Sequence, residues 1–300
     1  MANTPHLALA DVTTSGDGTN TTKYRFAADE GNSVESVLLP SLEAASVSTQ
    51  VGCRMGCRFC GVGESPRVLR NLHAHEIVAQ VLAMQTSANT GIESSPPSIR
   101  NLFYFGMGEP LANFDNVLGS MEQFHRMGIE RFAVASCGLV PMFPQLAKIP
   151  LAIRLFVSLH APNNRLRSEL MPINRQYPIE ALLEGILEYR RSSFLGQPVY
   201  VNYVMLRGIN DSPDAMMELG RLLEDYRTDV IVLLKLFNRI DTLPLRGTSR
   251  RQIRRCVRVL ESCGVCCHYT ESYGRDINAG GGQLTPGSPF TAGEEGKRGQ

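Results

Sequence analysis

The chain has 300 residues, 43% of them hydrophobic, and a formal net charge of +1. This length suits one large barrel or two ordinary domains, and the balanced charge shows no general basic excess typical of nucleic-acid-binding proteins. No apolar run reaches the roughly 18 residues of a membrane span, and the N-terminus lacks the apolar core of a secretory signal. Eight cysteines, three of them clustered, indicate a reducing cytoplasm and metal chemistry rather than a disulfide framework.

Both ends of the chain have the composition of disordered segments. Residues 1–22 are polar and aperiodic, and residues 285–300 have few apolar side chains to bury. Two short β-like runs, Lys23–Ala27 and Ser33–Leu39, follow the first segment. We therefore expect residues 23–44 to form a small β extension at the edge of the main domain.

Between residues 45 and 284, short β-rich runs alternate with longer amphipathic runs. The β-rich runs are Ala45–Val51, Asn101–Phe105, Phe132–Ala135, Leu155–Leu159, Val199–Met205, Val230–Leu236 and Cys267–Glu271. This alternation predicts parallel strands joined by crossover helices. We expect an α/β fold, a partial (β/α)6 TIM-like barrel over residues 45–284, with its chemistry at the C-terminal ends of the strands.

Three cysteines, Cys53, Cys57 and Cys60, follow the first of these runs with the spacing C-x3-C-x2-C. Structural zinc sites and fully ligated [4Fe–4S] clusters usually take four protein ligands. Three thiolates leave one position open. The spacing, with Phe59 before the third cysteine, resembles the loop of the radical S-adenosylmethionine (SAM) superfamily, in which SAM binds the free iron. For the triplet alone, half of a zinc site and buried structural thiols are the alternatives.

Polar residues also follow other predicted strands. Glu109 ends the segment Phe105–Pro110, in which two glycines allow close backbone approach, and it can accept hydrogen bonds from an ammonium group. Ser158 and His160 share one strand face, and Asn238 follows the sixth run of the barrel. Read singly, these residues are equally compatible with structural turns or hydrogen-bonded core positions.

Taken together and in order, these segments resemble the RNA adenine C2/C8 methyltransferase family of radical SAM enzymes. The similarity covers residues 23 to 284 and includes the cysteine loop, Gly106–Asn113, Ser158–Asn163, Met171–Asn174, Tyr203–Leu206 and Asp276–Leu284. The resemblance implies a [4Fe–4S] cluster and SAM as cofactors, with the cluster held by Cys53, Cys57 and Cys60. It implies SAM-binding positions at Gly108, Glu109, Ser158, Leu159, His160 and Asn238. It also implies a general base at Glu35.

The sequence departs from this family where methyl transfer needs thiols outside the cluster. Gly281 stands at the position of the methyl-carrying cysteine, and Ser46 at that of the resolving cysteine. Neither side chain can replace a redox-active sulfur. Ala135 stands where the family has a SAM-contacting serine. Because the β pair begins near residue 23, we expect no N-terminal RNA-binding domain of the family's kind.

These departures favour hydrogen abstraction over methyl transfer. We expect a 5′-deoxyadenosyl radical, formed by cleavage of SAM, to abstract hydrogen from a small molecule. Epimerisation of a carbinol carbon in a sugar or related natural-product intermediate is the preferred outcome, with a dehydrogenase or mutase as alternatives. Cys137 is the predicted hydrogen-atom donor, because it lies two residues past Ala135 on the same strand face. Its alternative interpretation is a small residue packed in the barrel wall.

Two other classes of function stay open. A divergent RNA methyltransferase would need a relocated thiol, for which Cys266 and Cys267 are the candidates, and the third class is a non-catalytic iron–sulfur or zinc module. For the preferred function we expect a cytoplasmic enzyme with a small-molecule substrate and a flavodoxin- or ferredoxin-type electron donor, without RNA or a membrane as partner. Five arginines between residues 250 and 258 are interpreted as a solvated helix face.

Overall fold

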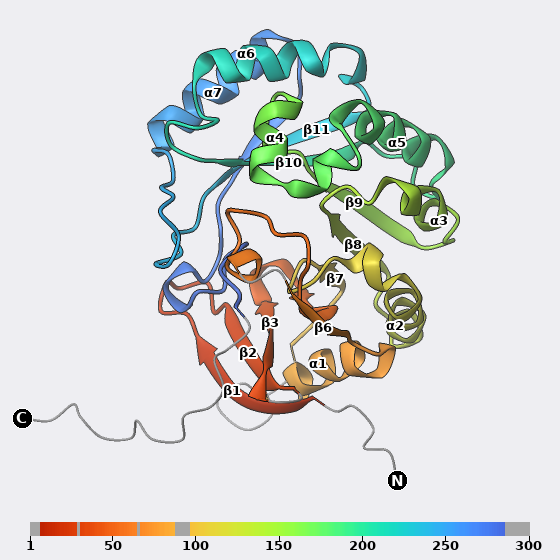
Figure 1. The fold of residues 1–300 in the computed structure, drawn as a ribbon. Coiled ribbons are helices and arrows are strands. Elements are labelled where there is room, and N and C mark those ends of the chain that lie inside the picture. Colours follow the sequence, from red (N-terminus) through yellow and green to blue (C-terminus); the bar gives the residue numbers. More distant parts are fainter. Residues whose placement is uncertain (1–6, 29–30, 65–66, 88–96, 286–300) are drawn as a thin grey trace, which may run out of the picture.

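The computed structural model describes residues 7–28, 31–64, 67–87 and 97–285. The described strands form a large sheet and a separate two-stranded ladder, β5–β6. The large sheet has the order β1-β2-β3-β4-β7-β8-β9-β10-β11-β12 (Figure 1). The strands are β1 (Ala8–Thr14), β2 (Thr22–Ala27), β3 (Ser33–Leu39), β4 (Ala44–Ser46), β5 (Gln50–Gly52), β6 (Val68–Asn71), β7 (Asn101–Tyr104), β8 (Arg131–Ser136), β9 (Ala152–Ser158), β10 (Val199–Met205), β11 (Val230–Leu236) and β12 (Cys267–Thr270).

Neighbouring strands from β4 to β12 in this order are parallel, and helices connect them. The helices are α1 (Ala74–Ser87), α2 (Phe114–Arg126), α3 (Phe143–Ala147), α4 (Asn164–Leu170), α5 (Ile179–Ser192), α6 (Pro213–Leu222) and α7 (Arg250–Ser262). The sheet ends at β1 on one side and at β12 on the other, so the barrel stays open. The predicted α/β fold with a partial barrel is confirmed.

The two faces of the curved sheet have different side chains. In β11, Val230, Val232 and Leu234 are at most 1% exposed and face the helices. The alternate residues, which include Lys235, face the interior of the barrel, the lumen. Helix α7 also has one buried and one exposed face, because its buried residues Ile253, Cys256 and Leu260 recur every three or four positions.

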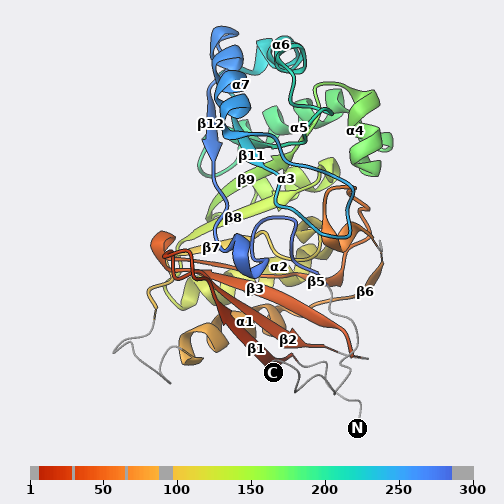
Figure 2. The ribbon, with the colours of Figure 1, turned by 90° about the vertical axis from the view of Figure 1, so that its left-hand side faces the viewer.

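The N-terminal segment differs from the expected disorder. Residues 8–14 form β1, which pairs antiparallel with β2 at one edge of the sheet (Figure 2). Most of β1 is exposed, so its sequence lacks the apolar alternation of a half-buried strand. The turn after β1 is fixed by Ser15 Oγ, which donates to Asp276 Oδ1 over 2.6 Å. Residues 1–6 and, apart from Thr285, the expected C-terminal tail lie outside the described residues.

Across the parts of the chain that the structure describes, every helix is too short or too polar to span a membrane.

The predicted β extension corresponds to β2 and β3, which pair antiparallel with each other. Strand β3 then pairs antiparallel with β4, and β4 pairs parallel with β7. The extension is therefore continuous with the barrel sheet.

Candidate active site

The three clustered cysteines lie on one loop between β5 and the 3-10 turn Gly61–Glu64. The Cys60 N–H donates to the Cys57 carbonyl over 3.2 Å. Burial raises the pKa of Cys53 to about 12, and burial together with the charges of Cys60 and Cys53 raises that of Cys57. Because the charge of one thiolate raises the pKa of the next, the three thiols are close enough to bind one cationic metal centre. Such a centre would stabilise them as thiolates.

The thiols are not arranged around a single point. Among the described residues, no three His, Cys, Asp or Glu side chains are placed to hold one metal ion. A [4Fe–4S] cluster has another requirement, because each cysteine binds a different iron. Three spaced thiolates on one loop therefore suit a cluster better than a structural zinc ion, which takes four ligands around one centre.

Glu109 lies just after β7 and is buried, with 3% of its surface exposed. Its Oε1 accepts from the Leu111 N–H over 3.1 Å, and its Oε2 accepts from the Cys137 N–H over 2.7 Å. Gly108 has a φ of +99°, and a Cβ there would lie 2.7 Å from the Gln50 side chain. A carboxylate offers about four acceptor sites, so Glu109 can still bind the amino group of a ligand. Burial raises its pKa.

Ser158, Leu159 and His160 occupy the C-terminal end of β9. His160 adopts a φ of 58°, and its Nδ1 accepts from the Val204 N–H over 3.0 Å. Burial lowers the pKa of His160 to about 3, so the ring is neutral and its proton lies on Nε2. The ring meets Phe59 edge-on, with the ring centres 4.6 Å apart. The structure thus brings the end of β9 against the cysteine loop.

Asn202 and Asn238 each have a buried side-chain oxygen without a hydrogen-bond partner in the described part of the chain. Asn238 Nδ2 donates to Ser272 Oγ and to the Gly281 carbonyl, both over 3.0 Å. Asn202 is the register partner of Ser158. Unsatisfied buried acceptors are costly, and the hydroxyl and amino groups of an adenosine would satisfy them. The sequence indicated Asn238 but not Asn202, which is hidden within an apolar strand.

Glu35 lies on β3 and forms an ion pair with Lys23, with its Oε1 3.0 Å from the Lys23 Nζ. Its Oε2 accepts from the Thr285 N–H over 3.2 Å. Thr285 lies close to Gly61 of the cysteine loop, where an added Cβ would be 2.8 Å from its methyl group. Glu35 therefore joins the β extension to the edge of the site. Its role as a general base stays a prediction.

Cys137 directly follows β8 and is buried. Burial and the negative charge of Glu109 raise the pKa of its thiol, and the Cys137 N–H donates to Glu109 Oε2 over 2.7 Å. The charges of Cys57 and Cys53 act in the same direction. Cys137 is therefore beside both the cysteine loop and Glu109.

The remaining cysteines lie elsewhere. Cys256 and Cys263 belong to α7 and its C-terminal end. Cys267 Sγ donates to the Val257 carbonyl over 3.6 Å, on the α7 side of β12, and Cys266 is exposed just before that strand begins. The start of a parallel strand is the end opposite the catalytic mouth. Cys266 and Cys267, the sequence candidates for a relocated thiol, are therefore wrongly placed for that role.

Lys235 lies in the lumen and was not predicted from the sequence as a site residue. Its Nζ lies 6.0 Å from the centre of the Phe105 ring, although β11 and β7 are not neighbours in the sheet. The rings of Phe105, Phe156 and Tyr200 form a row. The centres of the Phe105 and Phe156 rings are 4.9 Å apart, and those of Phe156 and Tyr200 are 4.6 Å apart. Within the described ranges Lys235 has no ion pair, and burial lowers its pKa to about 8. A lysine in an otherwise apolar strand, Val230–Leu236, was the signal that could have revealed it.

Comparison with known proteins decides the family. A family model of the Radical SAM superfamily matches residues 47–220. The chain belongs to the radical SAM superfamily. It is 38% identical to the "Probable dual-specificity RNA methyltransferase RlmN" of Dictyoglomus turgidum, over 91% of this chain and 78% of that protein. A protein of the same name from Desulforudis audaxviator is 38% identical, over 93% and 86% of the two chains.

A solved structure agrees with these radical SAM relatives. The crystal structure of a radical SAM methyltransferase from Sphaerobacter thermophilus matches 93% of this chain and 81% of that chain, with a TM-score of 0.85 and 35% identity. Radical SAM enzymes use a [4Fe–4S] cluster and SAM, and these are the cofactors of this enzyme.

The relatives correct the expected reaction and partner. Epimerisation of a sugar-like small molecule, and the exclusion of RNA, are both wrong, because the relatives of this radical SAM chain are named RNA methyltransferases. The first error came from treating two missing thiols as evidence for a different substrate. The second came from the same missing thiols, the expected lack of the family's RNA-binding domain and the balanced net charge, which averages over the whole surface.

Replacing Cys57 by serine should prevent loading of the cluster, because iron–sulfur irons require soft thiolate ligands. Iron content and visible absorption after anaerobic reconstitution with iron and sulfide measure this effect. Cys263→Ser, a cysteine substitution outside the loop, should load like the wild type. Equal iron content in the two variants would show that Cys57 is not a ligand.

Replacing Lys235 by methionine should stabilise the cluster-free protein at neutral pH by about 2–3 kcal/mol, because it removes a partly buried cation that has no ion pair among the described residues. The pKa of Lys235 is lowered to about 8 in the folded chain. The unfavourable effect of its charge on folding is therefore complete below that pH, and it fades as the pH rises towards the unfolded value of about 10.4.

Urea unfolding of wild type and Lys235→Met at neutral and alkaline pH measures this difference. The exposed Lys148→Met is the control and should change stability little at either pH. A stabilisation by Lys235→Met that is the same at both pH values would contradict an origin in the lysine charge.

Proposed function

We propose that this radical SAM enzyme methylates RNA. The observation that carries the proposal is that relatives 36–38% identical, across 91–93% of this chain, are named RNA methyltransferases. The Sphaerobacter structure supports the same reaction class, because that protein is a radical SAM methyltransferase. The site has the groups that a SAM-dependent reaction needs, and its buried acceptors suit an adenosine.

In this proposal each group of residues has a defined task. The cluster ligands are Cys53, Cys57 and Cys60, and the residues around SAM are Gly108, Glu109, Ser158, Leu159, His160 and Asn238. When bound, the reduced cluster supplies the electron that cleaves SAM to a radical. Glu109 would accept hydrogen bonds from the amino group of SAM, and Asn238 and Asn202 from its adenosine. His160, being neutral, would donate from Nε2 without adding charge to the site.

We further propose that Cys137 provides the thiol for methyl transfer. Of the cysteines outside the cluster loop, only Cys137 lies beside Glu109 and the loop. Its sulfur would accept the methyl group of SAM and its proton would pass to the Glu109 carboxylate, whose Oε2 lies beside it and accepts from the Cys137 N–H over 2.7 Å. The products of that transfer would be S-adenosylhomocysteine and S-methylated Cys137. Release of methylated RNA from Cys137 would need a second thiol, which Ser46 does not provide and which a small-molecule thiol would supply by forming a disulfide with Cys137. This methyl-accepting role replaces the role of hydrogen-atom donor that was predicted for Cys137 from the sequence, because the earlier role belonged to the epimerase hypothesis.

Incubation with SAM labelled in its methyl group tests this function. Wild-type protein should transfer label to RNA and carry label on Cys137. The rate of RNA methylation by Cys137→Ser should be lower by a factor of more than about a hundred, because the variant lacks the nucleophile. Cys266→Ser is the matched control and should keep full activity. RNA without label from the wild type would overturn the function, and labelled protein from Cys137→Ser would overturn only the role of Cys137.

Position 281 allows a test by gain of a thiol. A Cβ added at Gly281 would meet no atom within 4 Å, and the Gly281 carbonyl accepts from Asn238 beside the site. Gly281→Cys in the Cys137→Ser background should therefore restore protein-bound methyl label, and further addition of Ser46→Cys should raise RNA methylation. Gly281→Ala in the same background controls for side-chain bulk. No label on the Gly281→Cys protein would show that position 281 does not face the methyl donor.

A further inference from the structure

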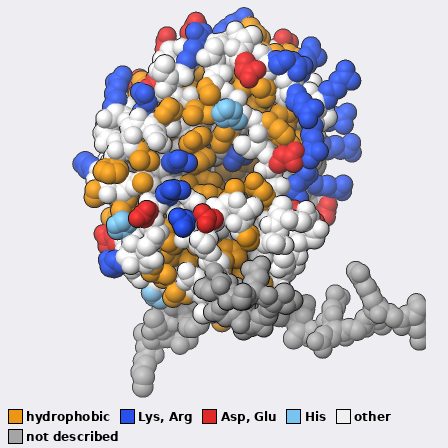
Figure 3. All heavy atoms as spheres, turned by 180° about the vertical axis from the view of Figure 1, so that it is seen from behind, with side chains coloured by type: hydrophobic (Ala, Val, Ile, Leu, Met, Phe, Trp, Pro, Cys, Tyr) orange, Lys and Arg blue, Asp and Glu red, His pale blue; other side chains and the backbone are white. Residues whose placement is uncertain are grey.

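A row of arginines covers the outer face of α7. Four of them, Arg251, Arg254, Arg255 and Arg258, are exposed, and the described residues offer them no hydrogen bond or ion pair. The first arginine of the helix, Arg250, pairs with Glu271 over 3.0 Å. Figure 3 shows Lys and Arg side chains gathered along the edge of the molecule where α7 lies, seen from behind. One face therefore concentrates positive charge in a chain whose net charge is only +1.

This arrangement is unfavourable for the helix itself. The first turn of α7 has no acidic residue, although the helix dipole favours negative charge there and disfavours Arg250 and Arg251. Arg251 and Arg255, like Arg254 and Arg258, are four residues apart, a spacing at which equal charges repel. A ligand with several negative charges would relieve both effects.

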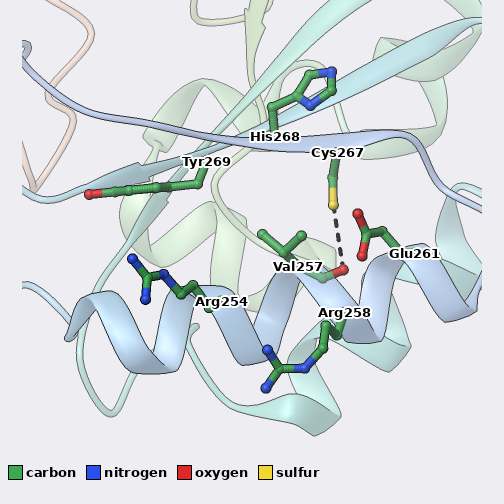
Figure 4. Close-up of a pocket in the computed structure, with 7 residues that line it drawn as sticks. All are labelled: Arg254, Val257, Arg258, Glu261, Cys267, His268 and Tyr269. Atoms are coloured by element: carbon green, nitrogen blue, oxygen red, sulfur yellow. Dashed lines mark hydrogen bonds between the residues drawn. The ribbon is translucent and has the colours of Figure 1, made fainter.

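A cleft of about 420 Å³ lies between α7 and the edge strand β12. It is lined by Arg254, Val257, Arg258, Glu261, Cys267, His268 and Tyr269 (Figure 4). Figure 4 shows Arg254 on the Tyr269 side of the cleft, while Glu261 lies on the Cys267 side. One end of the cleft thus combines a guanidinium with an aromatic ring, whose hydroxyl donates to Glu271 Oε1 over 3.0 Å. The charge of Glu271 is paired with Arg250, and Glu261 lies at the other end of the cleft.

The beginning of α7 lies close to the catalytic mouth. The Thr248 N–H donates to the Met205 carbonyl over 3.4 Å, and Gly247 forms a β-bridge with Leu206. Met205 is the last residue of β10, so the segment before α7 is fixed at the C-terminal end of that strand. From there α7 runs back along the outside of the barrel. A polymer whose target nucleotide enters the mouth could therefore continue along the arginine row.

We propose that the cleft between α7 and β12 binds single-stranded RNA, with Arg254 and Arg258 against its phosphates and Tyr269 against a base. This inference rests on the proposed function and assigns part of its RNA-binding surface. Arginine recognises phosphate through paired N–H donors. Aromatic side chains stack on the exposed bases of single strands but not on bases inside a duplex. The combination at the Tyr269 end of the cleft therefore favours single-stranded over duplex RNA.

Binding of a fluorescent mixed-sequence oligoribonucleotide to the cluster-loaded enzyme tests the inference. Arg254→Ala/Arg258→Ala should weaken binding about tenfold at moderate salt, and should lower the slope of log affinity against log salt by about 1.4, because two phosphate contacts are lost. The control removes two exposed arginines from other helices, Arg126→Ala/Arg191→Ala, and changes the net charge equally. It should leave both quantities nearly unchanged.

A second variant separates stacking from charge. Tyr269→Leu should weaken single-stranded RNA binding by about fivefold or more and leave the binding of an RNA duplex unchanged. Equal effects of the α7 and control double variants, in an enzyme that methylates RNA, would overturn the inference alone. A wild-type enzyme that neither binds nor methylates RNA would overturn the proposed function together with it. Cluster absorption confirms that each variant is folded and loaded.

Discussion

One buried cation determines the geometry of the catalytic mouth. Arg167, on α4, is fully buried, and its guanidinium donates to the carbonyls of Cys137 and Ser158 over 2.8 and 3.0 Å. It also donates to Asn174 Oδ1 over 2.8 Å. These bonds join the ends of β8 and β9 to the helix that follows β9. Because an unpaired buried charge costs several kcal/mol, these strand ends have little freedom to separate.

The same helix fixes the cysteine loop, since the Arg58 N–H donates to the Leu170 carbonyl at the end of α4 over 3.0 Å. Arg167 therefore positions Cys137, Ser158 and, through α4, the cluster loop as one unit. Its positive charge also favours the thiolate form of Cys57, against the larger opposing effect of burial. The polar groups that face the lumen are thus held by backbone contacts before any ligand binds, which reduces the reorganisation that catalysis requires.

The sequence predicted those features that depend on local pattern. The alternation of apolar runs predicted the parallel strands, and the cysteine spacing and the segment ending at Glu109 predicted the cofactors. Features that depend on tertiary placement were not accessible. Asn202 and Lys235 are functional candidates only because the barrel turns them inward, and strand β1 has no apolar alternation to reveal it. The spacing of Cys266 and Cys267 could not show that both lie at the wrong end of the barrel.

The error about function has the same physical origin. The missing thiols at positions 46 and 281 were taken to favour hydrogen abstraction over methyl transfer, and a relocated thiol was considered only at Cys266 and Cys267. A parallel barrel allows other positions, because the ends of all its strands meet at one mouth. A thiol at the end of β8 can therefore approach the same reacting centre as one in the C-terminal segment. In the function proposed above, the constraint on the thiol is contact with Glu109 and the cluster loop, and Cys137 fulfils it from a different strand.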